Sequence, residues 1–204
     1  MEFRLHYRGP LKTSSKNGDQ TTKHKHEIRK KIHKQMQRLW QQMPLKEYQY
    51  ILKQDEELLN HQEDSLKSKD GKNTPSFLRK IDKVENFTFV PLVNQKMDLI
   101  AELEIILLRE EEPGVLKGSD LDNQLKTLLD ALRMPKSKEE LPQAAPEEGE
   151  EPFFCLLEDD KLVTRLVVEA DRLLEPTEQN YVELLIHVRT KVTIAKVDNI
   201  GFGV

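Results

Sequence analysis

Several residue types are scarce in this chain, and each scarcity excludes a class of protein. There is one cysteine, Cys155, in 204 residues, so no internal disulfide is possible and a reducing compartment is the expected setting. No apolar run approaches the roughly 18 residues that a membrane-spanning helix needs, and the N-terminus has no signal-peptide core. We therefore expect a cytoplasmic protein with no membrane partner.

Apolar residues are also few, at 37% against 33% charged residues. A chain of this length suits one domain, and a composition this polar indicates that part of it is solvated or disordered. We expect a single domain over 1–204, with a basic region over 1–60 and a core over 87–194. Residues 133–152 are rich in Pro, Glu and Ala, which predicts a disordered acidic insertion.

The net charge of -4 hides an asymmetry along the chain. Residues 1–53 carry 13 Lys and Arg against 4 Asp and Glu, whereas residues 54–204 carry 19 against 32. A basic part beside an acidic part suits an enzyme that holds phosphates with one and a metal with the other. An ordinary acidic protein with one solvated basic helix has the same asymmetry.

Hydrophobic periodicity predicts an α+β fold, with a mixed sheet flanked by helices. The strand over 99–110 is rich in Ile and Leu, which suggests burial on both faces. Residues 153–157 lead into an acidic turn and are not assigned to a strand. The expected elements are strands over 2–8, 87–93, 99–110, 162–174 and 181–194, and helices over 23–42, 45–60 and from 119 onward.

The most informative segment begins at Ser119. Asp120, Asp122 and Lys126 lie on the polar side of a short predicted helix whose other side is rich in leucine. Carboxylates this close repel each other unless a cation lies between them, and Mg²⁺ or Mn²⁺ is the usual choice. A second acidic pair, Asp159 and Asp160, occupies a predicted tight turn before a strand, and folding can bring it to the first pair.

A purely structural interpretation of these residues is also open. Asp120 or Asp122 can cap the helix, and Asp122 and Lys126 have the spacing of an ordinary i,i+4 ion pair. Asp159 and Asp160 can form a turn and nothing more. Short motifs match by chance often enough that spacing alone does not decide between the two interpretations.

The run Asp120-Leu121-Asp122-Asn123, with Lys126 and Asp130-Ala131-Leu132 in phase, resembles the signature of the RusA family of Holliday junction resolvases. The later segment Asp159-Asp160-Lys161-Leu162-Val163 matches the paired aspartates of that signature in order and setting. The resemblance extends from about residue 87 to residue 192, and is specific within about fifteen residues.

This resemblance implies a Mg²⁺-dependent endodeoxyribonuclease that cuts four-way DNA junctions as a homodimer. By position it implies Asp120, Asp122 and Asp160 as metal-binding catalytic carboxylates, and Lys126 as the cation that contacts the scissile phosphate. Asn123 and Asp130 match too, and we expect them to orient the site or cap the helix.

The chain departs from the family pattern in three places. The connection from Asp130 to Asp159 is longer than in compact members, and Leu162 replaces a polar residue. The N-terminal segment lacks the usual Pro-Ser-Asn character. Metal chemistry is compatible with all three departures, whereas selectivity for junctions is put in question.

The basic helix is predicted to bind the DNA backbone. The affinity of the protein for DNA should therefore fall steeply as the salt concentration rises. His24 and His26 fit the same basic arm better than a zinc site, since no cysteine accompanies them. A non-catalytic DNA- or protein-binding member of the same fold, and a metal-dependent nuclease with another substrate, are the alternative functions. The predicted DNA-binding residues are Lys12, Lys16, Lys23, Lys25, Arg29 and Lys30.

Overall fold

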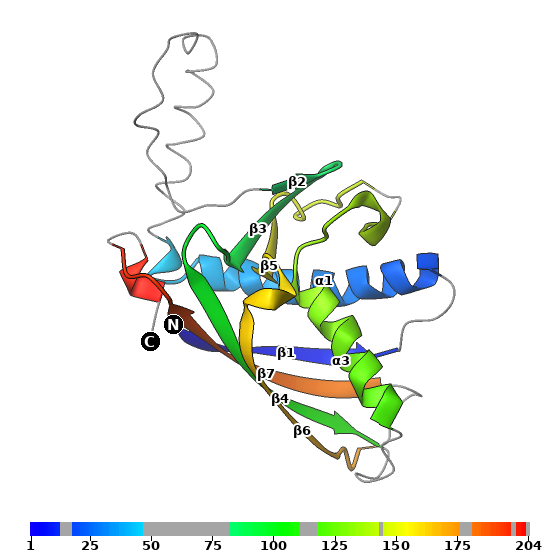
Figure 1. The fold of residues 1–204 in the computed structure, drawn as a ribbon. Helices are drawn as coiled ribbons and strands as arrows, with labels where there is room; N and C mark the ends of the chain where they lie inside the picture. Colours follow the sequence, from blue (N-terminus) through cyan, green and yellow to red (C-terminus); the bar gives the residue numbers. More distant parts are fainter. Residues whose placement is uncertain are drawn as a thin grey trace, which may run out of the picture.

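The computed structural model describes residues 1–12, 18–46, 82–110, 118–142, 145–175, 181–196 and 199–202. Within them, strands and helices form the expected α+β fold (Figure 1). No described helix is both long and apolar enough to cross a membrane. The elements in chain order are β1 (Glu2–Pro10), α1 (Gly18–Trp40), β2 (Asp82–Val84), β3 (Phe87–Val93), β4 (Leu99–Arg109), α3 (Gly118–Leu132), the 3₁₀ turn η1 (Lys138–Glu140), β5 (Phe153–Leu157), η2 (Asp160–Leu162), β6 (Val163–Arg172), β7 (Tyr181–Val192) and η3 (Ile200–Phe202).

The larger sheet has the strand order β1-β7-β4-β6, with β4 and β6 parallel and the other neighbours antiparallel. Burial alternates along β4, where Leu103 and Ile105 are buried and Glu104 and Ile106 are not. This alternation follows from the two-residue period of a strand and leaves one face uncovered. Burial on both faces, suggested by the Ile- and Leu-rich sequence, is therefore wrong.

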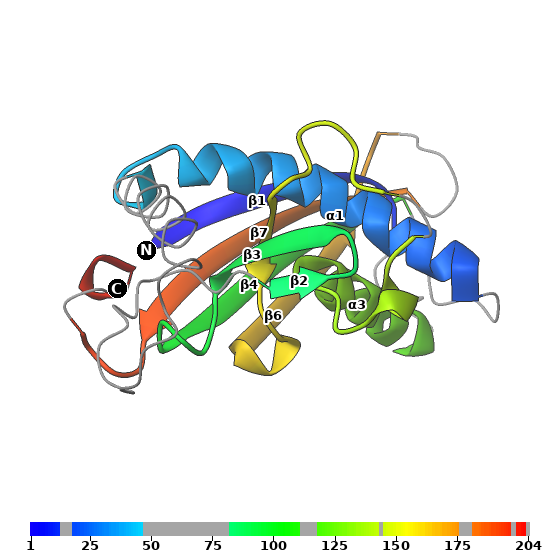
Figure 2. The ribbon, with the colours of Figure 1, turned by 90° about the horizontal axis from the view of Figure 1, so that it is seen from above.

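Both helices lie on the same side of this sheet, as Figures 1 and 2 show together. α1 presents Ile28, Ile32, Met36 and Trp40 to the core at helical spacing, as the sequence predicted. Apart from its first two positions, the helix predicted over 45–60 lies outside the described residues.

A second, smaller sheet with the order β2-β3-β5 was not predicted as a separate unit. β5 is buried along its whole length and runs parallel to β3. Its run of five apolar residues gives no alternation from which to recognise a strand. Cys155, in its centre, is 1% exposed and acts as a small buried hydrophobe.

The predicted disordered insertion is wrong for residues 133–142 and 145–152. The Arg133 guanidinium is buried and forms two hydrogen bonds with the Glu140 carboxylate, at 2.8 and 2.9 Å. The Glu147 carboxylate accepts a hydrogen bond from Lys30 at 2.6 Å, and the Gly149 carbonyl contacts His33. Glu140 and Glu147 thus neutralise a cation of this segment and one of α1, respectively.

Candidate functional site

The polar face of α3 carries the residues that the sequence singled out. Leucines of this helix pack on or into the core, so the opposite side faces solvent. Asp122, Asn123 and Lys126 are all exposed there. Asp122 and Lys126 are four residues apart, which places them about 40° from each other around the helix axis.

Asp122 and Lys126 do not form the ion pair that their spacing allows. Each lacks a hydrogen bond or ion pair with any other residue that the structure describes. The i,i+4 ion-pair interpretation of these two residues is therefore wrong. Two opposite charges remain available to a ligand on one exposed turn.

Asp120 lies within the first turn of α3, where the structure describes its backbone and not its side chain. Residues two apart in a helix do not face each other, and Asp120 and Asp122 are about 160° apart around the axis. The two positions that the sequence analysis grouped together therefore start from different sides of the helix axis.

Asp159 and Asp160 occupy the turn between β5 and β6, as predicted. Lys136 Nζ lies 3.1 Å from Asp159 Oδ2 and 3.7 Å from Asp160 Oδ1. Burial alone would raise the pKa of Asp159, but the Lys161 backbone N–H, Asp160 and the Lys136 ammonium together hold it far below its usual range. The partner of this acidic pair is a lysine of the same chain.

The structure does not bring Asp160 to Asp122. Asp122 precedes the last residue of α3 by ten positions, about 15 Å of helix axis, whereas Lys136 follows that end by four. The parallel register agrees, because β6 begins beside Ala101 and the chain leaves β4 at its other end. Figure 1 shows η2 near the C-terminal end of α3.

A divalent cation needs carboxylate oxygens at about 2.0–2.6 Å, and Asp122 and Asp160 lie toward opposite ends of α3. Within the described ranges, no three His, Cys, Asp or Glu side chains converge closely enough to hold a metal ion. Asp122 and Asp160 are not grouped with further carboxylates around one point among the described side chains, and the side chain of Asp120 is not among these.

Asp130, which also matches the motif, connects the two helices. Its carboxylate accepts hydrogen bonds from Lys25 at 2.6 Å and from Arg133 at 3.0 Å, and its carbonyl accepts one from Arg29 at 3.1 Å. Burial would raise the pKa of Asp130, but the Lys25 hydrogen bond and the two nearby cations outweigh it and lower the pKa. Asp130 therefore holds α1 against α3.

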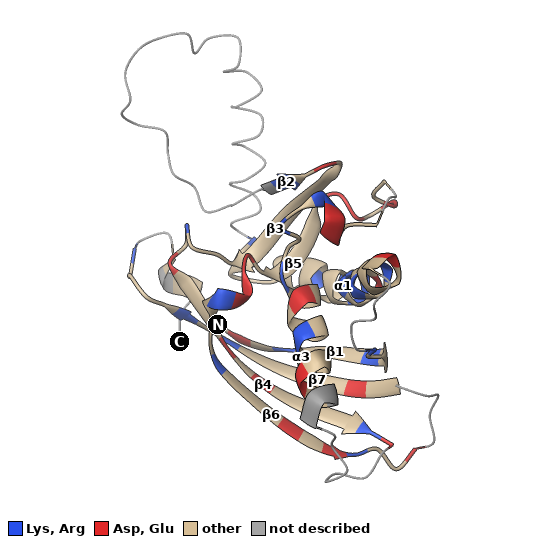
Figure 3. Cartoon of the chain, turned by 45° about the vertical axis from the view of Figure 1, so that its right-hand side comes forward, with Lys and Arg blue, Asp and Glu red and all other residues tan. Residues whose placement is uncertain are grey.

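Most of the predicted DNA-binding residues on α1 already have partners. Lys23 pairs with Asp19 at 2.8 Å, Lys25 with Asp130, and Lys30 with Glu147. The three carboxylates come from α1 itself, from α3 and from the 145–152 segment, respectively. Basic and acidic positions both occur on α1 and on α3 (Figure 3).

Arg29 is wrong as a DNA-binding residue, because it is only 1% exposed. Burial lowers its pKa to about 10. Lys12 is exposed as expected, and Lys16 lies outside the described residues.

Two histidines of α1 are buried, so the prediction that His26 belongs to a DNA-facing basic arm is wrong. His26 is 4% exposed between Phe87 and Phe153, and burial lowers its pKa to about 4. His33, which the sequence did not single out, accepts a hydrogen bond from the Phe154 backbone N–H at 2.8 Å. The regular spacing of apolar residues on α1 was the signal that could have placed both histidines inside.

Comparisons with protein-family profiles, with curated proteins and with solved structures found no match to this chain. The functional argument therefore depends on the residues and their geometry.

Proposed function

We propose that this chain is an endodeoxyribonuclease acting on branched DNA, and that the exposed face of α3 contacts the phosphodiester. The supporting observation is that Asp122 and Lys126 stand at ion-pair spacing, exposed and unpaired among the described residues. Charged neighbours that do not neutralise each other are available to bind a substrate. The resemblance to RusA nucleases supplies the reaction class and the four-way junction as substrate.

Lys126 would stabilise the charge that builds on the phosphate as it becomes pentacoordinate. A lysine suits this role because its ammonium is a compact charge that can point outward from a helix surface. Asp122, one turn away, would orient the attacking water or the phosphate. Lys12, exposed on the segment before α1, would contact the DNA backbone.

The resemblance also brings Mg²⁺ or Mn²⁺ dependence into the proposal. A bound divalent cation polarises a phosphate oxygen and lowers the pKa of its water. The described carboxylates do not converge on one point, so the roles given above to Asp122 and Lys126 do not pass through a cation.

The first test is cleavage of a four-way junction, a flap and a linear duplex with Mg²⁺. We expect the wild-type protein to cut the junction, Asp122→Asn to abolish cleavage, and Lys126→Met to slow it by about 100-fold or more. Glu148→Gln, an exposed carboxylate replaced outside α3, is the matched control and should cut normally. Wild-type cleavage rates in both α3 variants would refute the site assignment.

Asp160→Asn decides between the resemblance and the described geometry. Normal cleavage would place Asp160 outside the site, in agreement with its distance from Asp122. Lost cleavage with unchanged Tm would mean that Asp160 reaches the site from another copy or after a rearrangement, as the predicted metal-binding role requires.

The second candidate is a DNA- or protein-binding module without catalysis. The observation that favours it is the lack of a convergent metal-ligand group among the described side chains. A titration with Mg²⁺ separates the two, because a protein with no cation site gains no Mg²⁺-linked thermal stability. Stabilisation by Mg²⁺ that Asp122→Asn removes would exclude this candidate.

A further inference from the structure

The larger sheet has two edge strands, β1 and β6, and the surroundings of their free sides differ. In the order β1-β7-β4-β6, each edge strand has one side on which no described strand pairs with it. Such a side exposes a row of backbone N–H and C=O groups, to which another chain can bind as an added strand. Native proteins therefore usually cover, interrupt or charge the free side of an edge strand.

Side chains of α1 cover the free side of β1. The His6 backbone N–H donates to the Gln35 side-chain oxygen at 2.9 Å, and the Gln35 amide donates to the His6 carbonyl at 2.6 Å. Two residues further along, the Arg8 carbonyl accepts a hydrogen bond from the Lys31 ammonium at 2.7 Å. The backbone groups that an added strand would use at this edge are therefore already bound.

β6 has no such cover in the part of the chain that the structure describes. The Leu173 N–H, just beyond β6, donates to the Arg109 carbonyl of β4 at 2.6 Å. Because backbone groups point alternately to the two sides of a strand, the residues of β6 that point away from β4 are Leu166, Val168 and Ala170. Their three N–H and three C=O groups have no hydrogen-bond partner among the described residues.

The sequence of β6 also lacks the residues that usually block strand addition. Over Val163–Arg172 it has ten residues and contains no Pro, Gly or Lys. Its register with β4 shifts only near its start, beside Ala101. Beyond that shift the free side of β6 is regular enough to pair with another strand.

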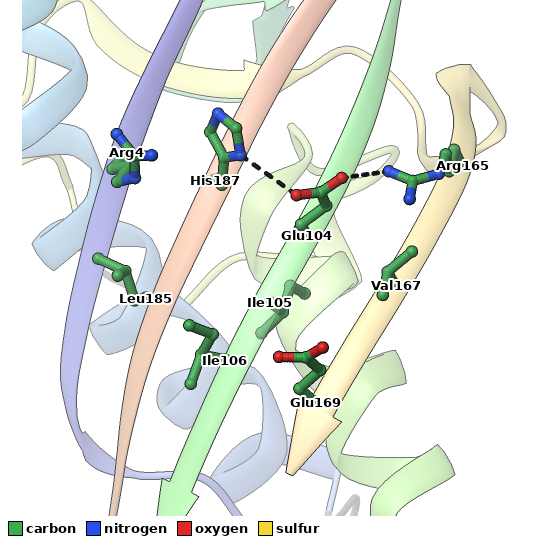
Figure 4. A pocket seen from close by; sticks show the side chains of 9 residues that line it. All are labelled: Arg4, Glu104, Ile105, Ile106, Arg165, Val167, Glu169, Leu185 and His187. Atoms are coloured by element: carbon green, nitrogen blue, oxygen red, sulfur yellow. Dashed lines mark hydrogen bonds and ion pairs between the residues drawn. The ribbon is translucent and has the colours of Figure 1, made fainter. Parts of the chain in front are cut away.

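The charged side chains of β6 favour a basic partner. On the face turned away from the helices, Arg165 reaches back to Glu104 on β4, whereas Glu169 forms no ion pair with a described residue (Figure 4). Asp171, the next residue on this face, is also exposed and has no ion-pair partner in the described ranges. The carboxylates of Glu169 and Asp171 are therefore available to basic groups.

On the other face of β6, apolar surface extends to the edge of the sheet. Val168 and Ala170 pack against the core, whereas Leu166 is 40% exposed although it lies on the same face. Side chains of directly opposed residues on neighbouring strands lie about 5 Å apart. An apolar side chain of an added strand would therefore contact Leu166 and extend the core outward.

We propose that the free side of β6 binds an extended segment of another protein, in which apolar residues alternate with Lys or Arg. The backbone of this segment would pair with the open N–H and C=O groups of β6, which provides affinity. Its alternate side chains would provide specificity, with the basic set beside Glu169 and Asp171 and the apolar set beside Leu166.

A second copy of the chain and a nucleic acid fit this edge less well. Two antiparallel β6 strands would bring Arg165 to the partner's Glu169, but Arg165 is already bound to Glu104. A nucleic acid would bring phosphates to two carboxylates that no described cation neutralises, and like charges repel. A basic, partly apolar segment has neither disadvantage.

Binding of a synthetic peptide of alternating valine and lysine, as long as β6, tests the proposal in a titration of the full chain. We expect saturable binding. A peptide with the same composition, but with all valines before all lysines, is the matched control and should bind about tenfold or more weakly, because it cannot place the two residue types on separate faces. A valine–glutamate peptide should bind at least about tenfold more weakly too.

Amide hydrogen exchange locates the bound peptide. In the free chain, the N–H groups of Leu166, Val168 and Ala170 should exchange faster than those of Val167 and Glu169, which point toward β4. The valine–lysine peptide should slow exchange at the first three residues by about tenfold or more.

A charge reversal tests the contribution of the side chains. Glu169→Lys should weaken binding of the valine–lysine peptide by about fivefold or more. Glu148→Lys, at an exposed position outside the sheet, is the matched control and should leave this binding unchanged.

Several outcomes would overturn the proposal. These are no saturable binding of the valine–lysine peptide up to about 1 mM, equal binding of its control peptide, equal effects of Glu169→Lys and Glu148→Lys, and unchanged exchange at the three amides. Slowed exchange there that depends on protein concentration without peptide would mean that a second copy occupies the edge, and would overturn it as well. All readouts are independent of whether the chain cleaves DNA.

Discussion

Replacing Asp130 tests the connection between the two helices. Its carboxylate, with 14% of the side chain exposed, accepts hydrogen bonds from Lys25 on α1 and Arg133 beyond α3. Asp130→Ala removes both contacts. The variant therefore measures how strongly α1 is held to α3 by charge.

The expected loss of stability depends on which other contacts Lys25 and Arg133 keep in the variant. Arg133 keeps its two hydrogen bonds to Glu140, so its remaining cost is small. Lys25, with 21% of its side chain exposed, loses its only carboxylate partner among the described residues. Two charged hydrogen bonds at about 1.5–3 kcal/mol each, reduced by this compensation, give a loss of about 3 kcal/mol.

Thermal and urea unfolding measure this loss. A chain of this size should lose about 6–12 °C in Tm for about 3 kcal/mol. Asp122→Ala is the matched control, because this exposed aspartate on the same helix has no partner in the part of the chain that the structure describes. It should change stability by less than about 0.5 kcal/mol.

The effect should also depend on pH. The pKa of Asp130 is lowered in the folded state, so its contribution is present above the unfolded pKa of about 3.9 and is lost as pH falls through the folded value. Equal stabilities of Asp130→Ala and Asp122→Ala at pH 7 would refute the reasoning.

Three further predictions concern buried polar groups of α1. Arg29→Met should leave Tm unchanged or raise it, because the Nε and Nη1 atoms of Arg29 are buried without hydrogen-bond partners, and junction affinity in a binding assay should not fall. His26→Leu should make stability less sensitive to acid. The pKa of His26 is about 4 in the folded state and about 6.5 when unfolded, so the wild type should lose about 3 kcal/mol of unfolding free energy relative to the variant as pH falls from 6.5 to 4. Urea unfolding at several pH values measures this difference. His33→Leu leaves the Phe154 N–H without its acceptor and should cost about 1–3 kcal/mol in the same assay.

The elements with clear periodicity were predicted well. α1 and β1 have one apolar side at a regular spacing, and the structure buries that side. β5 was missed because five consecutive apolar residues have no period, and only parallel pairing with β3 makes them a strand.

Charge was the weaker guide at sequence level. Lys23, Lys25 and Lys30 have the composition of a DNA-binding helix, yet each pairs with a carboxylate of this chain. The sequence order reveals the Lys23–Asp19 pair, whose members are four residues apart, but not the other two, because Asp130 and Glu147 are more than a hundred residues from their lysine partners.

The candidate site shows the same division. Local sequence was enough to place Asp122 and Lys126 on one exposed face of a helix, since four residues make about one turn. Whether Asp160 joins them depends on how the chain crosses between two sheets, and the parallel register of β4 and β6 places it at the other end of α3. Hydrophobic periodicity is a local property, so the amino-acid sequence alone determines it. Which distant residues come together, and which face of a sheet stays uncovered, is decided only when segments far apart in the chain pack against each other.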